Sequence, residues 1–151
     1  MLATWFGVGL IPVAPGTWGS LAALPFAWVI HDLWGVLGLA LGALIAFVGG
    51  CWAAGAFAKA SGEVDPAAIV VDEVAAQWLV LIAAPLQPLA WALAFLLFRL
   101  FDIWKPWPVR WVDRHVKGGL GIMLDDVAAA GYALLALGAV AAIGGVLGVC
   151  V

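Results

Sequence analysis

Long uncharged apolar stretches restrict the fold of this chain more than any other feature. Residues 33–58 hold no charged side chain, and further apolar runs at 69–84, 89–104 and 124–148 carry charges only near one end. A helix of roughly 20 apolar residues crosses the hydrocarbon core of a bilayer, where only helices and closed barrels satisfy their backbone hydrogen bonds. Because 67% of the residues are hydrophobic and only 10% are charged, the composition excludes an ordinary soluble domain. We therefore expect an integral membrane protein.

These runs predict an all-α fold, a polytopic membrane helix bundle of about five spans of roughly 20 residues each. The expected crossings are 21–30, 33–58, 69–84, 89–104 and 124–148. The run at 21–30 is short, so it crosses only if 17–20 form its first turn; otherwise it dips into the membrane. Residues 12–20 contain two prolines and two glycines, which predicts a re-entrant or loop N-terminal segment. A single domain over residues 1–151 is expected.

Three connecting segments carry local signals. Asp65 followed by proline is typical of an N-cap with proline at the first helical position, so we expect a helix from there with Asp72 and Glu73 in its second turn. Residues 107–116 combine arginines with tryptophans and predict a short amphipathic segment at the membrane interface. The glycines of 117–121 predict a flexible connection before the last span.

Charges of both signs interrupt the apolar sequence at 98–108 (FRLFDIWKPWP), and ionisable groups at a membrane edge indicate a functional site. On a helix, Arg99 and Asp102 are i, i+3 neighbours on one face, and Lys105 lies one turn further along. Two prolines then end the helix, because proline lacks an N–H group and disfavours helical geometry in the residue before it. Lys105 is therefore expected at a helix end, among tryptophans that are typical of the headgroup level.

Most charged residues fall on one side of the membrane when the five crossings are counted. All six basic residues share that side: Lys59, Arg99, Lys105, Arg110, Arg114 and Lys117. The opposite side carries only His31, Asp32 and Gln87. Because basic residues favour the cytoplasmic side of a membrane protein, we expect the polar side to face the cytoplasm.

Five carboxylates from three predicted helices lie at this membrane edge: Asp72, Glu73, Asp102, Asp125 and Asp126. Carboxylates without nearby histidine or thiol ligands suit a hard cation such as Mg²⁺, which keeps water and substrate phosphate as its other ligands. The alternative is that acids near helix starts only complement the helix dipole. Two adjacent pairs and an acid on a third helix exceed what capping needs, so the pattern favours a metal site.

The basic residues at the same edge are candidates for phosphate binding: Arg99, Lys105, Arg110, Arg114 and Lys117. Arginine forks and lysine ammonium groups bind phosphate, although the last three serve equally well as headgroup anchors. The motif PGTWGS (15–20) offers backbone N–H groups and two hydroxyls, which suits an anion but is also an ordinary way to begin a helix. Together with the acids, these groups indicate metal-assisted phosphoryl chemistry on a lipid headgroup.

Four motifs, in their order along the chain, resemble the phosphatidylglycerophosphatase A family: PGTWGS (15–20), DPAAIVVDE (65–73), FRLFDIWKPWP (98–108) and GGLGIMLDD (118–126). Ala76 departs from the family pattern, which has glycine after the Asp-Glu pair. The resemblance implies a Mg²⁺-dependent phosphatase that converts phosphatidylglycerophosphate to phosphatidylglycerol in the bacterial cytoplasmic (inner) membrane, with its active site on the cytoplasmic side. The implied partners are this phospholipid and the membrane, with no nucleic acid; the oligomeric state stays open.

The resemblance also implies roles for individual residues. The expected metal ligands are Asp72, Glu73, Asp125 and Asp126. The expected catalytic residues are Asp72, Glu73, Asp102 and Asp126, where Asp102 either joins the metal shell or orients Lys105. Substrate binding is expected from Thr17, Gly19, Ser20, Arg99, Lys105, Arg110 and Arg114. Attack by water and a covalent aspartyl-phosphate are both compatible with this set.

Three other classes of protein remain as alternatives. An ion or proton transporter also carries intramembrane acids and arginines, but it needs polar residues through the bilayer midplane. A CDP-alcohol phosphotransferase is another Mg²⁺-using lipid enzyme, but its spaced aspartates within one segment are absent from this sequence. A structural membrane scaffold explains the glycines but leaves the convergence of charges without a reason.

Overall fold

The fold is built from helices alone over the part of the chain that the structure, a computed structural model, describes, residues 1–146. In chain order the elements are the 3-10 turn η1 (Val8–Leu10), α1 (Pro15–Ser61), α2 (Val71–Leu81), α3 (Pro88–Trp104), α4 (Val109–His115) and α5 (Gly118–Val146). The all-α prediction is confirmed. The predicted end of the last span, at residue 148, lies outside the described residues.

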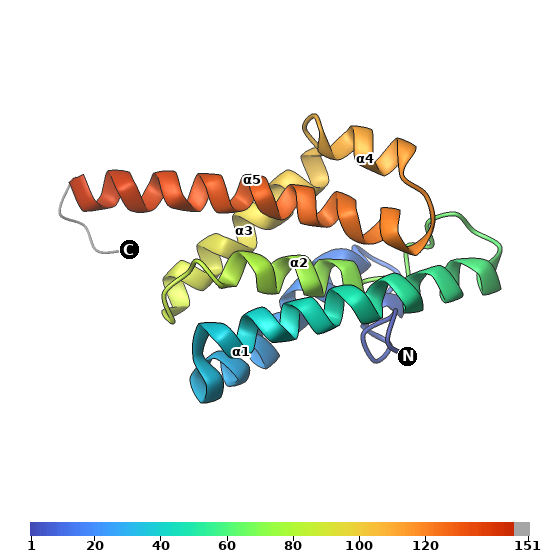
Figure 1. Cartoon of the computed structure of the whole chain (residues 1–151), viewed down its shortest axis with the longest axis horizontal. Helices are drawn as coiled ribbons and strands as arrows, with labels where there is room; N and C mark the ends of the chain where they lie inside the picture. The colour runs from blue at the N-terminus through green and yellow to red at the C-terminus, as the bar shows by residue number, and fades with distance from the viewer. Residues whose placement is uncertain (147–151) are drawn as a thin grey trace.

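Helix α1 consists of two arms that meet at Gly35. The backbone there has φ +64° and ψ −162°, a conformation that essentially only glycine adopts. The chain turns back at this point, on the left of Figure 1, and the second arm returns along the bundle. The two arms correspond to the crossings predicted at 21–30 and 33–58, and the first arm starts early enough to include 17–20.

Two of the described helices, α1 and α5, are long and apolar enough to cross a membrane, which is fewer than the predicted five spans. Helix α2 has 11 residues, so its length of about 16 Å covers only about half of a bilayer core. The span predicted at 69–84 is thus wrong in length, because α2 is too short. Helix α3 is longer, with 17 residues. Helix α2 packs against α1, α3 and α5, and nearly all of its side chains are buried, so its neighbours surround it.

The N-terminal segment explains why α2 begins at Val71 and not at the predicted Asp65. The N–H groups of Val70 and Val71 donate to the carbonyl of Ala3, at 2.9 and 3.2 Å. Trp5 packs edge-on against Trp78 of α2. These tertiary contacts satisfy the backbone before the helix, and Asp72 and Glu73 fall in its first turn instead of its second. The residues before α1 form a folded loop with one 3-10 turn.

Two segments expected to be irregular are helical. Residues 15–20 form the first turns of α1 because proline at the first helical position needs no hydrogen-bond partner for its nitrogen. Residues 118–121 form the first turn of α5. A Cβ at Gly119 would overlap the carbonyl of Cys51, so this glycine permits close contact between α5 and α1 and does not provide a flexible connection. The segment 107–116 contains a short helix, α4, as predicted.

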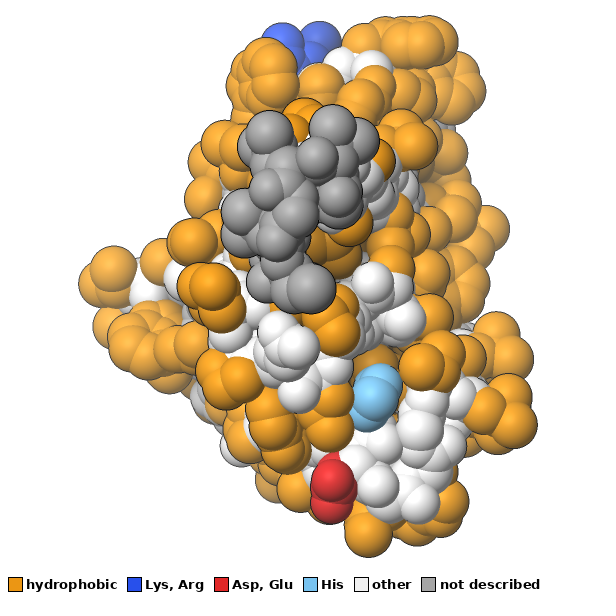
Figure 2. Space-filling model, turned by 90° about the vertical axis from the view of Figure 1, so that its left-hand side faces the viewer, with side chains coloured by type: hydrophobic (Ala, Val, Ile, Leu, Met, Phe, Trp, Pro, Cys, Tyr) orange, Lys and Arg blue, Asp and Glu red, His pale blue; other side chains and the backbone are white. Residues whose placement is uncertain are grey.

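The two ends of the bundle differ in polarity. In Figure 1, α5 starts toward the right and α2 nearer the middle, and both run to the left, whereas α3 runs the other way and ends close to α4. The charged residues of these helices lie near the starts of α2 and α5 and near the end of α3. Figure 2 shows the left-hand face of Figure 1, which is mostly hydrophobic, with a small basic patch at its upper edge and small histidine and acidic patches lower down. The predicted gathering of charges at one end is therefore present in the fold.

Candidate active site

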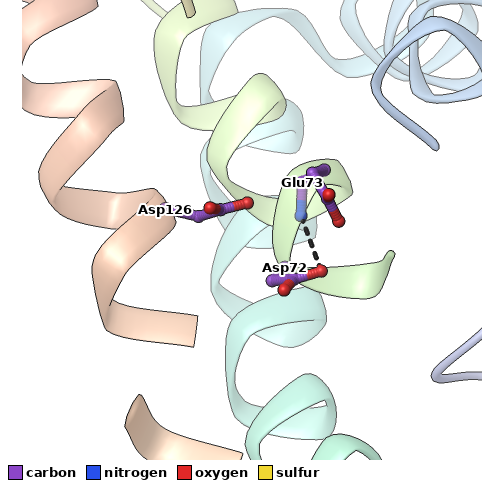
Figure 3. Close-up of side chains that lie close together, drawn as sticks. All are labelled: Asp72, Glu73 and Asp126. Carbon is purple, nitrogen blue, oxygen red and sulfur yellow. Dashed lines mark hydrogen bonds between the residues drawn. The ribbon is translucent and has the colours of Figure 1, made fainter. Parts of the chain in front are cut away.

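Three carboxylates converge at the charged end of the bundle. Asp72 and Glu73 lie in the first turn of α2, and Asp126 reaches toward them from α5 (Figure 3). One carboxylate oxygen from each of the three lies within 4.8 Å of the others. The N–H of Glu73 donates to Asp72 Oδ1 at 3.0 Å, which holds the two neighbours together. Asp72 and Asp126 are 9% and 4% exposed, so the cluster is closed off from solvent on most sides.

These acids fit a divalent cation. Glu73 Oε2 and Asp126 Oδ2 are buried and have no hydrogen-bond partner among the described residues. A buried carboxylate oxygen without a partner costs free energy, and three carboxylates this close repel one another. A hard cation with oxygen ligands would remove both costs, and Mg²⁺ is the cation that one or two carboxylates plus phosphate and water suit best. The donor set is thus compatible with the expected metal.

Arg99 connects the acidic cluster to α1. Its Nη1 lies 2.6 Å from Asp102 Oδ2, one turn along α3, and 3.8 Å from Glu73 Oε1. The same nitrogen donates to Ser20 Oγ at 3.3 Å. Arg99 Nε is buried without a partner among the described residues, so this guanidinium retains a donor that protein atoms leave unused. The i, i+3 pairing expected for Arg99 and Asp102 is present.

The PGTWGS motif brings the start of α1 against the same cluster. A Cβ at Gly16 would overlap the Glu73 carboxylate, so a larger residue here would displace that side chain or the start of α1. The hydroxyl of Ser20 donates to the Gly16 carbonyl at 3.0 Å and is fully buried. Gly19 packs against Val70, where an added Cβ would lie 2.7 Å from the valine Cβ, and Thr17 lines the cavity described below. The motif therefore fixes the position of Glu73 as well as presenting polar groups.

Lys105 bridges α4 and α5. Its ammonium donates to Asp113 of α4 at 2.8 Å and to Asp125 of α5 at 2.7 Å. Burial lowers the pKa of this ammonium, but the two carboxylates raise it more strongly, and the net pKa lies above the ordinary lysine value. Its backbone is left-handed, with φ +46°, at the end of α3. A charged lysine is thus held in place by backbone geometry and by two ion pairs.

A cavity of about 360 Å³ joins these groups, and it lies within the range of small-ligand sites. The polar and charged residues in its wall are Thr17, Asp65, Asp72, Glu73, Arg99, Asp102, Lys105, Asp125 and Asp126. The structure therefore brings together all five predicted acids, Arg99 and Lys105. Asp125 contributes to the wall but is paired with Lys105, while Asp126 faces Asp72 and Glu73.

Two predicted substrate-binding residues lie elsewhere. Arg110 and Arg114 line a separate groove of about 510 Å³ along α4, and Lys105 borders both this groove and the cavity.

Sequence reasoning missed two residues that shape the site, Gly16 and Asp113. The signal for Gly16 was its place inside a helix-starting motif, and the signal for Asp113 was its position as the one acid among the basic residues of α4.

A buried carboxylate cluster beside an arginine and a lysine, at one end of an apolar helix bundle, defines a membrane-associated enzyme of the phosphoryl-transfer class. Residues 1–141 match the family model described as phosphatidylglycerophosphatase A. The chain belongs to this family, as the resemblance of its motifs indicated.

Curated relatives agree with this family. A protein named phosphatidylglycerophosphatase A from Escherichia coli K12 is 42% identical over 137 residues, covering 85% of this chain and 75% of the relative. A protein of the same name from Haemophilus influenzae is 42% identical over 141 residues, covering 93% and 86%. A Bacteroides thetaiotaomicron protein with the provisional name phosphatidylinositol-3-phosphatase is 40% identical over 149 residues, covering 89% and 88%. No solved structure matches the chain.

Proposed function

We propose that this protein is a single integral-membrane phosphatase domain that removes the terminal phosphate of phosphatidylglycerophosphate, with Mg²⁺ as cofactor. Family membership supports the reaction. The observation that carries the Mg²⁺ dependence is the convergence of Asp72, Glu73 and Asp126, together with the unpartnered oxygens Glu73 Oε2 and Asp126 Oδ2. Bound by these three residues, Mg²⁺ would supply Lewis-acid polarisation of a phosphoryl oxygen.

The cations of the cavity are arranged to receive the terminal phosphate. Arg99 is oriented by Asp102 and Ser20, and it lines the cavity. Lys105 adds a second positive charge in the cavity wall. Because both groups are fixed before the substrate arrives, they stabilise charge on the transferring oxygens without reorganisation. The Asp125 and Asp113 carboxylates act through Lys105, so we assign them positioning roles.

We place the active site on the cytoplasmic side of the bacterial inner membrane. Arg99 and Lys105 line the cavity that holds the acidic cluster, Arg110 and Arg114 line the groove that shares Lys105 with it, and the face in Figure 2 is mostly apolar. Basic residues near the ends of spans favour the cytoplasmic side.

Phosphatidylinositol 3-phosphate is a second candidate substrate, because one relative, 40% identical to this chain, is named as a phosphatidylinositol-3-phosphatase. Both names describe a phosphatidyl group, in which a phosphodiester joins diacylglycerol to a polyol that carries the phosphomonoester. The transporter alternative draws no support from the family match.

The experiment is phosphate release by the purified protein in neutral detergent, with either lipid as substrate. We expect phosphatidylglycerophosphate to be hydrolysed with Mg²⁺ present, hydrolysis to stop with EDTA, and excess Mg²⁺ to restore it. Full activity in EDTA would refute the Mg²⁺ dependence. A clear preference for phosphatidylinositol 3-phosphate would show that the substrate carries inositol in place of glycerol. Hydrolysis of neither lipid would refute the proposed function.

A further inference from the structure

The groove along α4 has the composition of an anion site at a membrane surface. Its lining comprises Trp104, Lys105, Pro106, Trp107, Arg110, Trp111 and Arg114. The three tryptophans are 51% to 77% exposed, so the groove presents large apolar side chains at the protein surface. Exposed tryptophans next to arginines are typical of the headgroup level of a bilayer. The groove therefore has the composition expected of a surface at the level of lipid phosphates.

The two arginines of the groove lack an internal counter-charge. Arg110 and Arg114 are i, i+4 neighbours on α4, an arrangement in which like charges repel. Neither forms an ion pair with any acidic side chain in residues 1–146. The acid on α4, Asp113, is instead held by Lys105 at 2.8 Å. An external anion would relieve this repulsion, and arginine forks bind phosphate oxygens well.

The groove and the acidic cavity are adjacent. Lys105 lines both of them, since it ends α3 at the point where the chain turns into α4. An anion in the groove and an anion in the cavity would therefore lie on either side of one lysine. A lipid with two phosphates separated by a short polyol has this distribution of charge.

We propose that the α4 groove binds the phosphodiester of the same lipid whose terminal phosphate lies in the acidic cavity. This inference rests on the proposed function and adds a second phosphate subsite to it. Arg110 and Arg114 hold the diester, and the tryptophans contact the adjoining glycerol and upper acyl chains. The enzyme then selects lipids in which a phosphodiester lies between diacylglycerol and the phosphomonoester.

Steady-state kinetics of the full chain in neutral detergent micelles with Mg²⁺ test the subsite. Arg110→Gln and Arg114→Gln are each compared with Lys59→Gln, which removes one exposed positive charge from the end of α1, outside the groove. We expect each arginine variant to raise KM for phosphatidylglycerophosphate about tenfold with kcat within about twofold, because the diester is bound equally in the ground and transition states. Lys59→Gln should leave KM within about twofold.

Product inhibition gives an independent measurement, because phosphatidylglycerol keeps the diester and lacks the terminal phosphate. It should inhibit the wild type, diacylglycerol should not, and the arginine variants should need about ten times more phosphatidylglycerol for the same inhibition. Unchanged KM in both arginine variants, an equal rise in Lys59→Gln, a fall in kcat alone, or no inhibition by phosphatidylglycerol would each overturn the subsite. A wild type that hydrolyses no lipid would overturn the proposed function and the subsite with it.

Discussion

Asp125 and Asp126 are adjacent in the sequence, yet they contact different groups. Asp126 joins Asp72 and Glu73, whereas Asp125 accepts a hydrogen bond from Lys105 at 2.7 Å. Successive side chains on a helix point about 100° apart, so one pair of neighbours can face two different elements. The sequence predicted that both would be metal ligands; the geometry favours Asp126, and the ligand role of Asp125 stays a prediction. The sequence alone does not show which face of α5 meets α2.

The acidic cluster predicts an opposite response of activity and stability to one substitution. Asp126→Asn keeps the side-chain shape and removes one of three repelling negative charges. Because this charge belongs to the proposed Mg²⁺ site, we expect kcat to fall at least about 100-fold. Without Mg²⁺, the thermal midpoint should stay the same or rise, because the repulsion is smaller. Mg²⁺ should raise the midpoint of the wild type and not that of the variant.

The matched control is Asp32→Asn, an exposed acid at the opposite end of the bundle, which should leave both quantities unchanged. Phosphate release and thermal unfolding in detergent measure them. A folded Asp126→Asn protein with normal kcat would show that this acid is not part of the centre.

Gly16 allows a second prediction at this scale. In Gly16→Ala the new Cβ overlaps the Glu73 carboxylate, so either Glu73 or the start of α1 must move. We expect kcat to fall at least about tenfold, since small displacements of catalytic groups are costly. Gly131→Ala in α5, where a Cβ meets open space, should keep activity within about twofold and stabilise the helix by about 0.5–1 kcal/mol. Equal activities of the two variants would contradict the close approach of Gly16 and Glu73.

At the scale of elements, α2 is the clearest difference between sequence and structure. Its apolar run predicted a span, and its Asp-Pro pair predicted a start at Asp65. The backbone hydrogen bonds from Val70 and Val71 to Ala3 move the start to Val71, and this long-range contact leaves no local signal. A fully buried short helix and a short membrane span have the same hydrophobic pattern, so periodicity alone does not separate them. Helices α3, α4 and α5 overlap the runs predicted for them because proline and glycine mark their ends locally.

The burial of α2 on several sides makes it sensitive to added volume. Ala76 is fully buried, so Ala76→Leu should destabilise the protein by about 1–3 kcal/mol. Ala142→Leu, on an exposed position of α5, should change the free energy of unfolding by less than about 0.5 kcal/mol. Denaturation in detergent compares them, and equal stabilities would show that α2 has free space around Ala76.

At the scale of the whole molecule, the segregation of charge was predictable while the span count was not. Counting crossings placed every basic residue on one side, and in the structure one cavity joins acids from the starts of α2 and α5 with the charged residues near the end of α3. The predicted segregation of charge does not depend on the length of α2, because this helix begins at the charged end and so keeps Asp72 and Glu73 there. The cavity itself required side-chain packing, which the sequence does not encode locally.

This polarity predicts the labelling of single cysteines in intact bacteria. In a protein with Cys51 and Cys150 replaced by alanine, a membrane-impermeant maleimide should label Asp32→Cys from outside the cytoplasmic membrane. Glu63→Cys, in the exposed loop between α1 and α2, should react only after the membrane is permeabilised. Labelling of both positions from the same side would contradict the orientation.

The bonds from Val70 and Val71 to the Ala3 carbonyl involve only main-chain atoms, and such bonds are indifferent to side-chain identity. The exposed positions ahead of Pro15, such as Leu10 and Val13, can therefore change in sequence while the segment keeps its hydrogen bonds to α2. An insertion or deletion between Ala3 and Pro15 is different, because it shifts the carbonyl out of register with the start of α2. Indels in this stretch should thus be far more damaging than replacements, and a deep mutational scan would separate the two.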